Sequence, residues 1–587
     1  MISNIKKIIS VLLISAVLLS SFAACKPYED IETPDASDTP TESESGSLES
    51  VETPPEDPGE SGQIGEATLP EEPEIEKPEN PSKTLFQKSK EQYSSGNIGC
   101  TGLTLLAEYN KGVDFDINSY KDYDNKVYYL FLPCRADLSS VTFTVTHRDG
   151  SVSGPYTADF SDDDVSENEK VVGSVSTYAI KVMQSDRPTV MLEIDESYVT
   201  LKELKGDASH STYAYGAMVT TVTDELASEM GWATRYESKD EDASSNCSMK
   251  IRGRGNATWG YPKKPYQMVT ENPINLLGME YDTKYVFVAN YRDATGMRNA
   301  LALEMGHMLG IDYTSDYRQV DLFMNGEYLG MYTLAEKVEV GNGRVEIDQE
   351  NDVLFEYDNY AADEEIFGFQ TEYTNASKRG FRVHAPEDET RMATYKEYIN
   401  EAEKALFGKD SELYAKYFDV ESWAKAYILQ TYTMNSDAYY GSFYFYYDST
   451  DGKLHACSPW DFDWSMGVSW GSGSYINPEK YDLTSREWMA PMFKHKDFII
   501  AMLDVYYKGG GREVVQQMPE VIDRMAEENR LSALMNDVAL EVDYFPDDVT
   551  NYDEAVAYMR DIAVRRIDYM ETHMKSYAIL VKYQIPD

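Results

Sequence analysis

The feature that most limits what this chain can fold into is a change in composition near Lys83. Residues 26–83 consist almost entirely of Pro, Glu, Asp, Ser, Thr and Gly, and the part from Lys26 to Asn80 holds 18 acidic and 2 basic side chains. Such a segment cannot bury enough apolar surface to offset the entropy that its chain would lose on folding. We therefore expect a disordered acidic linker here, and a folded protein that begins at about Thr84.

A short N-terminal segment precedes the linker. Two lysines are followed by an apolar run that ends near Leu19 and is too short to span a bilayer. The stretch Phe22-Ala-Ala-Cys25 resembles the lipobox of bacterial lipoproteins, in which the cysteine is lipidated. We expect a signal peptide at residues 1–24, a lipid anchor on Cys25 and an extracytoplasmic protein held at the cell membrane. Phe22 stands where the pattern usually has an aliphatic residue, which leaves secretion without an anchor as the alternative.

Composition narrows the classes of partner. The chain has 587 residues, 42% of them hydrophobic, and a formal net charge of −49 at pH 7. The apolar content is sufficient for a large core in more than one domain. Like charges repel, so nucleic acid is excluded as the main partner, and an anionic lipid surface would be contacted only through the anchor. The oligomeric state is left open by the sequence.

Four cysteines follow Cys25, namely Cys100, Cys134, Cys247 and Cys457. Their spacing does not match a zinc site, and no histidine lies near them in ligand register. A disulfide between Cys100 and Cys134 is compatible with an extracytoplasmic location. Four free buried thiols are the alternative, because cysteine often packs as a small apolar residue.

Residues 84–187 show the pattern of a small β-sandwich. Short runs of alternating apolar residues, such as Lys126–Leu132 and Val141–Thr146, are separated by turns such as Arg148-Asp-Gly150. Nothing in the composition of this part indicates a site, so we interpret it as a support or spacer.

Residues 188–480 mix strands with helices, and residues 481–587 are helical. The pattern predicts a strand at 284–290, a helix at 296–309 with Leu301, Met305 and Met308 on one face, a hairpin at 321–334 turning at Asn325-Gly326, and a hairpin with strands at 442–447 and 453–456. In the tail, helices are predicted at 493–507, 511–536 and 552–577. The expected fold class is therefore α+β.

The first cluster with chemical character is basic. Arg252-Gly-Arg254-Gly-Asn-Ala-Thr-Trp is followed by Pro-Lys263-Lys264-Pro-Tyr. Alternating glycine and arginine gives a loop whose backbone N–H groups and guanidinium groups can approach an anion closely. In so acidic a chain this indicates phosphate binding, and a surface turn balanced by acidic neighbours is the alternative.

Two further clusters are acidic or polar. Asp437 and Ser442 lie just before and at the start of the second hairpin, and the stretch Ser-Pro-Trp-Asp461-Phe-Asp463-Trp follows it. In an extended strand residues i and i+2 face the same side, so we expect the two carboxylates of Asp461 and Asp463 to converge. Oxygen ligands of this kind suit Mg²⁺, Mn²⁺ or Ca²⁺. A proton acceptor, a metal-binding carboxylate and a basic loop are the parts that phosphoryl transfer needs.

Several longer motifs resemble those of the CotH family, the spore-coat protein H kinases. They are RGRGNATWGYPKKPYQM, NLLGM followed by KYVFVANYRDATGMRNALALEM, VDLFMNGEYLGMYTLAEKV, and NSDAYYGSFYFYYD leading to SPWDFDWSMG. The resemblance implies an atypical, two-lobed protein-kinase-like domain with a helical C-terminal part. It also implies binding of ATP with Mg²⁺ or Mn²⁺, and transfer of phosphate to serines of a protein substrate.

Residue roles carried over from the family are as follows. Asp437 resembles the catalytic aspartate that accepts the hydroxyl proton, and Asp461 the metal-binding aspartate, with Asp463 orienting the loop or sharing the metal. Lys264, with Lys263 as second choice, resembles the lysine that contacts phosphate, and Glu336 is the candidate for its ion-pair partner; Arg252 and Arg254 complete the expected nucleotide site. Ser442 stands where many members have an asparagine that holds a second metal ion, so Ser442 is the expected third metal ligand.

The sequence thus predicts a surface-anchored, metal-dependent serine kinase acting on extracytoplasmic or spore-coat-type proteins. Ser442 and the scarcity of ATP outside cells favour an alternative, a weakly active or inactive CotH-fold protein for surface display or adhesion that binds protein or carbohydrate. Glycoside hydrolysis is disfavoured, because Asp461 and Asp463 on one strand face would not flank a glycosidic bond from two sides.

Overall fold

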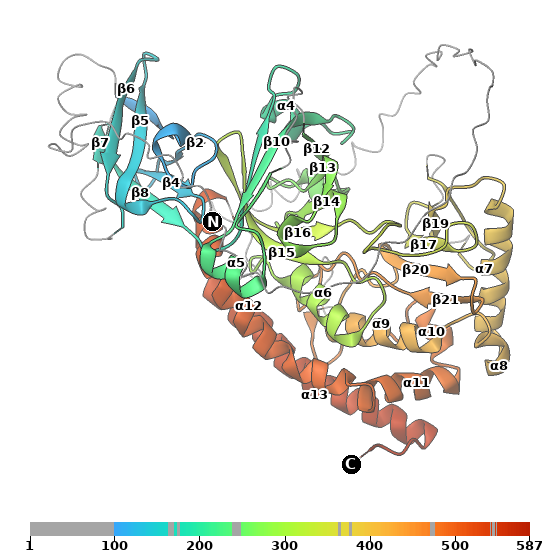
Figure 1. Ribbon diagram of the computed structural model, residues 1–587. Coiled ribbons are helices and arrows are strands. Elements are labelled where there is room, and N and C mark those ends of the chain that lie inside the picture. Colours follow the sequence, from blue (N-terminus) through green and yellow to red (C-terminus); the bar gives the residue numbers. More distant parts are fainter. Residues whose placement is uncertain are drawn as a thin grey trace, which may run out of the picture. The chain divides into compact units, whose positions relative to one another are not determined.

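The computed structural model shows a mixed α+β protein (Figure 1). It describes residues 99–161, 170–172, 176–237, 248–361, 366–374, 379–469, 476–540, 542, 546 and 549–586. The predicted signal peptide, the lipid anchor on Cys25 and the acidic linker lie outside the described residues. All described residues belong to one compact unit, Pro73–Asp587. The expected domain boundaries at residues 187 and 480 and the two-lobed architecture stay predictions.

Two four-stranded sheets form the first part of the described chain. One has the order β2-β1-β5-β6 and the other β3-β4-β8-β7. Their strands are β1 (Cys100–Leu105), β2 (Ile117–Asn118), β3 (Tyr120–Asp122), β4 (Val127–Leu132), β5 (Val141–His147), β6 (Val152–Ala158), β7 (Lys170–Val172) and β8 (Thr177–Gln184). Alternate residues of both sheets enter one hydrophobic cluster, which also takes in Met191, Phe323 and Met535 from later elements. The two sheets are therefore packed continuously onto the next part of the chain.

The predicted disulfide between Cys100 and Cys134 is wrong. Both thiols are free, as is that of Cys457. Cys100 is buried at the start of β1, whereas Cys134 follows β4 and its Sγ lies 3.5 Å from the carbonyl oxygen of Thr221. The two side chains have different neighbours, so free thiols, the alternative, are confirmed for these three positions, with Cys134 only partly buried. Cys247 lies outside the described residues.

An eight-stranded sheet follows, with the order β11-β10-β12-β13-β14-β16-β15-β9. Its strands are β9 (Thr189–Ile194), β10 (Ala214–Thr221), β11 (Arg235–Glu237), β12 (Met249–Gly253), β13 (Tyr266–Ile274), β14 (Asp282–Val288), β15 (Tyr317–Met324) and β16 (Glu327–Glu336). Strand β9 pairs in parallel with β15 and antiparallel with β10, which closes the sheet into a barrel. Two short helices, α4 (Leu201–Gly206) and α5 (Asp224–Met230), connect strands of the barrel.

The hairpin expected at residues 321–334 is present as β15 and β16. Its turn residues Asn325 and Gly326 have φ of 48° and 78°, the conformation that this dipeptide favours. The helix expected at 296–309 is α6 (Arg298–Leu309). Leu301, Met305 and the partly buried Met308 pack against one hydrophobic cluster, as expected, and most other residues of the helix are buried as well.

The last part combines a five-stranded sheet, β18-β19-β17-β20-β21, with helices. The strands are β17 (Val353–Asp358), β18 (Gly368–Phe369), β19 (Gly380–Ala385), β20 (Phe443–Asp448) and β21 (Lys453–Ala456). The helices are α7 (Met392–Leu406), α8 (Ser411–Tyr414), α9 (Val420–Tyr432), α10 (Met489–Met492), α11 (Lys496–Tyr507), α12 (Gly511–Ala539) and α13 (Tyr552–Val581). One large hydrophobic cluster joins this sheet, α6, α7, α9 and the C-terminal helices. The helical tail expected after residue 481 is confirmed.

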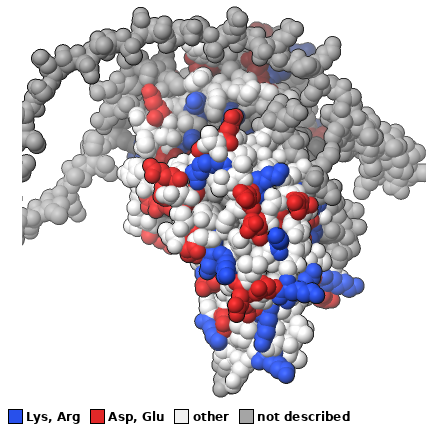
Figure 2. Space-filling model, turned by 90° about the vertical axis from the view of Figure 1, so that its right-hand side faces the viewer, with Lys and Arg blue, Asp and Glu red and all other residues white. Residues whose placement is uncertain are grey.

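Two surface properties bear on partners. Figure 2 shows acidic and basic side chains interspersed on the face it presents, so the net negative charge does not form an unbroken acidic surface there. Among the described residues, no helix has both the length and the apolar character needed to cross a membrane.

Candidate functional site

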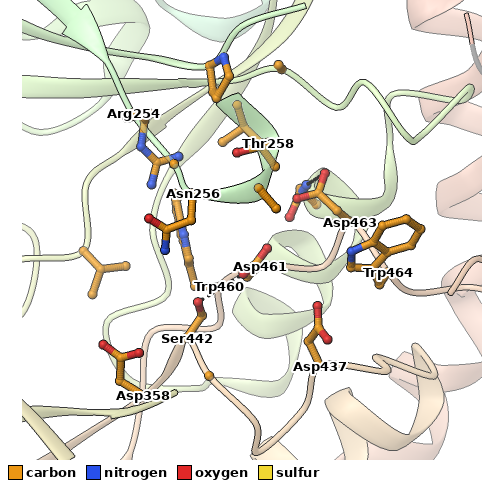
Figure 3. Close-up of a pocket in the computed structure, with 18 of the residues that line it drawn as sticks. Arg254, Asn256, Thr258, Asp358, Asp437, Ser442, Trp460, Asp461, Asp463 and Trp464 are labelled. Atoms are coloured by element: carbon orange, nitrogen blue, oxygen red, sulfur yellow. Dashed lines mark hydrogen bonds between the residues drawn. The ribbon is translucent and has the colours of Figure 1, made fainter. Parts of the chain in front are cut away.

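A cleft with a volume of about 750 Å³ collects most of the residues that the sequence singled out (Figure 3). Its walls come from the loop between β12 and β13, the end of β14, strands β17 and β19, and the segments 437–444 and 460–464. Nine of the predicted site residues lie within the described chain, and seven of them line the cleft: Arg252, Arg254, Lys263, Asp437, Ser442, Asp461 and Asp463. The other two, Lys264 and Glu336, do not line it.

The basic wall of the cleft starts at the end of β12. Arg254 lies over the ring of Trp460, with its guanidinium carbon 5.6 Å from the ring centroid, and its charge acts on Asp461. Arg252 donates to the carbonyl oxygen of His210 at 3.2 Å and lies 5.3 Å from the ring centroid of Tyr213. Aromatic rings thus hold both guanidinium groups in place, as expected for cation–π contacts.

The two adjacent lysines point in different directions. Lys263 is buried and lines the cleft, where its Nζ donates to the carbonyl oxygen of Met331 and lies 4.5 Å from the ring centroid of Tyr332. Burial lowers the pKa of Lys263 to about 7. The Nζ of Lys264 donates to the carbonyl oxygen of Trp259, away from the cleft lining. The structure thus places Lys263, the second choice from the sequence, in the cleft lining and leaves Lys264 outside it.

The ion pair expected between Glu336 and the phosphate-contacting lysine is not formed among the described residues. Within the described part of the chain, the carboxylate of Glu336 accepts a hydrogen bond from the backbone N–H of Asp316 at 3.0 Å and forms no ion pair with Lys263 or Lys264. Burial at the end of β16 raises the pKa of Glu336 to about 7. Its place in the barrel wall keeps it off the cleft lining.

The segment after α9 is joined closely to the segment after β21. The backbone N–H of Ser436 donates to the carbonyl oxygen of Trp464 at 2.9 Å, and the amide of Asn435 donates to that of Asp461 at 3.2 Å. The hydroxyl of Ser442 donates to the Asp461 carboxylate at 3.0 Å. These bonds fix Asp437, which lies between Ser436 and Ser442, relative to Asp461, and Figure 3 shows both side chains in the same cleft.

The convergence of Asp461 and Asp463 has a different cause from the one expected. The residues 459–464 are not in a strand, and Asp461 has a φ of 66°, in the left-handed region that residues with a Cβ rarely occupy. Ser442, which donates to it, has a φ of 53°. Such backbone conformations persist where surrounding contacts impose them, and they are common at functional sites. A turn, rather than strand alternation, brings the two carboxylates together.

Both carboxyl groups are held in a way that favours a positive ligand. Burial raises the pKa of Asp461, against the hydrogen bond from Ser442 and the charge of Arg254. Burial and then the charge of Asp461 raise the pKa of Asp463. Two half-buried acids next to one another repel, and a proton or a cation between them offsets that repulsion. With the hydroxyl of Ser442 they form a set of hard oxygen donors, which fits Mg²⁺ or Mn²⁺.

A polar segment that the sequence reasoning did not assign supports this pair. Asn299 of α6 donates to the Asp463 carboxylate at 3.2 Å and accepts from the backbone N–H of Phe462 at 2.8 Å. Arg298 forms a buried ion pair with Asp293 and donates through Nε to the carbonyl oxygen of Ser465 at 3.0 Å. The string of polar residues in Asn-Tyr-Arg-Asp-Ala-Thr-Gly-Met-Arg-Asn, next to a buried strand, was the signal for this role.

Four ionisable residues of the five-stranded sheet were also missed. Glu356 and Asp358 of β17 and Arg382 and His384 of β19 line the cleft. The Nε2 of His384 lies 2.6 Å from the carboxylate of Glu356. Both pairs are two residues apart, the spacing that places side chains on one face of a strand, and this alternation within apolar strands was the available signal.

One group of three carboxylate or histidine ligands within 4.8 Å of one another occurs in the described residues, and it lies elsewhere. It consists of Asp448, Asp451 and His455 on the β20–β21 hairpin, where Asp451 is exposed. The cleft carboxylates therefore offer an incomplete set of protein ligands. Mg²⁺ usually keeps several waters and takes substrate phosphates as further ligands, so an incomplete set fits a site that binds metal together with nucleotide.

A cleft with guanidinium groups on one wall and paired carboxylates on another is typical of proteins that bind an anionic ligand together with a divalent cation. The chain belongs to the CotH kinase protein family, whose model matches residues 251–570, more than half of its length. Membership of this family indicates an atypical kinase-like function, with ATP, a divalent metal and a protein substrate as the expected reactants. Among curated proteins, none matches the chain significantly.

Proposed function

We propose that this protein is a metal-dependent atypical serine kinase, which transfers the γ-phosphate of ATP to extracytoplasmic or spore-coat-type proteins. The observation that carries the proposal is the half-buried pair Asp461 and Asp463, which lines one cleft together with Arg254 and Asp437. Phosphoryl transfer requires little more from a protein than positioning and neutralisation of charge. The cleft supplies residues for both.

The residues divide between two tasks. Arg252, Arg254 and Lys263 supply donors for phosphate oxygens. Asp461, Asp463 and the hydroxyl of Ser442 would hold the metal ion. When bound, Mg²⁺ or Mn²⁺ neutralises charge on the phosphates and aligns them for transfer.

Asp437 is the proposed acceptor of the proton from the attacking serine hydroxyl. It is partly buried and lines the cleft, so a hydroxyl entering the cleft can reach its carboxylate. A positioned base of this kind contributes roughly 10²–10⁴-fold to rate. Ser442 in place of an asparagine offers a hydroxyl as the ligand near Asp461, which supports a site built around one metal ion rather than two.

The test uses the purified chain from residue 26 onward, labelled ATP and either Mg²⁺ or Mn²⁺. Incorporation of label is measured into the protein and into a panel of peptides that each carry one serine, with alanine versions as blanks. We expect Asp437→Asn to lose at least about 100-fold in transfer while keeping the stabilisation by nucleotide in a thermal melt. Asp461→Asn should lose both transfer and the metal-dependent part of that stabilisation.

Asp451→Asn is the matched control, because it removes a carboxylate from the hairpin cluster outside the cleft. It should leave transfer and nucleotide-induced stabilisation unchanged. Absence of transfer with both metals, together with no stabilisation by nucleotide, would refute the kinase proposal. Stabilisation without transfer would instead favour the inactive display or adhesion protein.

We also propose that a lipid on Cys25 holds the protein at the outer face of the membrane. The stretch Phe22-Ala-Ala-Cys25 after an apolar run supports this. Expression of the full chain with Cys25→Ala should move the protein from the membrane fraction to the soluble extracytoplasmic fraction. An unchanged distribution would contradict the anchor and favour plain secretion.

A further inference from the structure

The segment that carries Asp437 contains backbone conformations that it does not favour by itself. Met434 and Tyr439 have φ of 57° and 59°, in the left-handed region that side chains with a Cβ rarely adopt. Contacts from outside the segment must therefore hold it. The bonds to the 461–466 segment hold its first half, from Thr433 to Ser436.

Its second half is held by two arginines. Tyr440 lines the cleft, and its ring lies 3.7 Å from the guanidinium carbon of Arg379 and 4.4 Å from that of Arg486. Arg379 is tied to Glu487 by an ion pair. The Tyr440 backbone N–H donates to the carbonyl oxygen of Asp437 at 2.9 Å, so a fixed ring also fixes the turn that presents the Asp437 side chain.

Arg486 reaches both ends of this short segment. While its guanidinium lies against the ring of Tyr440, its NH2 group donates to the carbonyl oxygen of Ser436 at 3.3 Å. Asp437 lies between these two points. A planar guanidinium can stack and donate at the same time, which the ammonium group of a lysine cannot do.

We propose that Tyr440 and Arg486, with Arg379 behind them, are positioning residues that hold Asp437 in place for proton acceptance. They act through the segment 436–440 and do not contact the transferred phosphate. The inference rests on the proposed kinase function, because it assigns a purpose to the position of Asp437. It adds Arg379, which directly precedes β19, and Arg486, which precedes α10, to the site; neither belongs to the acidic and basic clusters seen in the sequence.

The first test compares Tyr440→Phe with Tyr440→Leu. The phenylalanine keeps the ring that both arginines contact, and the leucine removes it. We expect Tyr440→Phe to stay within about twofold of the wild-type kcat, and Tyr440→Leu to lose at least about tenfold in kcat, a part of what a positioned base contributes. The KM for ATP and the nucleotide-induced thermal shift should be unchanged in both.

Arg486→Lys is the second variant, and Arg560→Lys is its control. Arg560 pairs with Asp523 on the exposed side of α13 and has no role in the cleft. Arg486→Lys should lower kcat with an unchanged KM for ATP, and Arg560→Lys should alter neither. If kcat falls only in those variants whose melting temperature also falls, the contacts of Tyr440, Arg379 and Arg486 are merely structural, and the proposal is overturned.

Hydrogen exchange measured by mass spectrometry gives a result that does not depend on activity. Peptides that cover residues 435–441 should exchange faster in Tyr440→Leu and Arg486→Lys than in the wild type and in Tyr440→Phe. Unchanged exchange in all variants would overturn the proposed positioning role of Tyr440 and Arg486, even if kcat falls. If the wild type transfers no phosphate while exchange follows the expected order, the kinase function fails and the contacts are confirmed as a restraint on the segment alone.

Discussion

Glu336 was expected to pair with a lysine, and the structure shows it as a buried carboxyl without such a partner among the described residues. The pH dependence of protein stability distinguishes these two states. As the partner of a lysine it would be ionised, and its removal would weaken the protein at neutral pH. In the structure it is instead a buried carboxyl whose pKa is raised to about 7 from an ordinary 4.5. Glu336→Gln keeps the shape and removes the titration.

The sign of the pH effect follows from linkage. Because the pKa in the folded state lies above that in the unfolded state, the stability associated with the protonated group is fully present below about pH 4.5 and is lost as pH rises through 7. A shift from 4.5 to about 7 corresponds to about 3 kcal/mol, of which about 2.5 kcal/mol falls between pH 5 and pH 8. Glu336→Gln lacks this loss, so its stability relative to the wild type should rise by that amount over this interval.

Urea unfolding at pH 5 and pH 8 measures the effect. The comparison of the two pH values cancels any constant cost of the glutamine amide, such as a weaker bond to the N–H of Asp316. Glu421→Gln, at a side chain that is 64% exposed, controls for the loss of one negative charge and should change the free energy of unfolding by less than about 0.5 kcal/mol. A difference for Glu336→Gln that is the same at both pH values would refute the buried-carboxyl interpretation.

Three further outcomes are expected. Lys263→Met should raise the KM for ATP at least about tenfold, whereas Lys264→Met should stay near the wild type; equal effects would contradict the assignment. Asn299→Ala leaves the N–H of a buried loop residue without its acceptor and should cost about 1–3 kcal/mol in urea unfolding, together with a smaller metal-dependent thermal shift. Gly216→Ala places a Cβ 1.9 Å from a carbonyl oxygen of β9 and should cost about 1–3 kcal/mol, while Gly206→Ala, with no atom within 4 Å of its Cβ, should cost much less.

Local elements were predictable from the sequence, and the long-range pairing was not. The hairpin at Asn325-Gly326 and the helices of the tail follow from turn chemistry and from the period of apolar residues. Closure of the barrel depends on the parallel pairing of β9 with β15, strands more than 120 residues apart in the chain. No local sequence pattern specifies this pairing, because it depends on how the whole sheet packs on its two faces.

In the candidate site, too, some features could be predicted from the sequence and others could not. The order of the basic loop, Asp437 and the Asp461 motif correctly indicated residues that share one cleft. The choice between Lys263 and Lys264 depends on the direction of two adjacent side chains, which a single change in backbone angle reverses. Sequence spacing holds no information on that angle. It also does not show which way the Glu336 side chain points, so the ion pair with a lysine could not be judged from the sequence.

Asp461 and Asp463 were expected to lie in a strand, which is wrong, and their carboxylates were expected to converge, which they do. A strand would have aligned them by alternation alone, at no conformational cost. The structure aligns them through a left-handed residue at Asp461, which is disfavoured and is held by Ser442, Asn435 and, through Asp463, by Asn299. A chain retains such a conformation only where surrounding contacts hold it, and here these hydrogen bonds do so. That arrangement supports a cleft organised around a bound cation, because strand geometry alone would not require these supports.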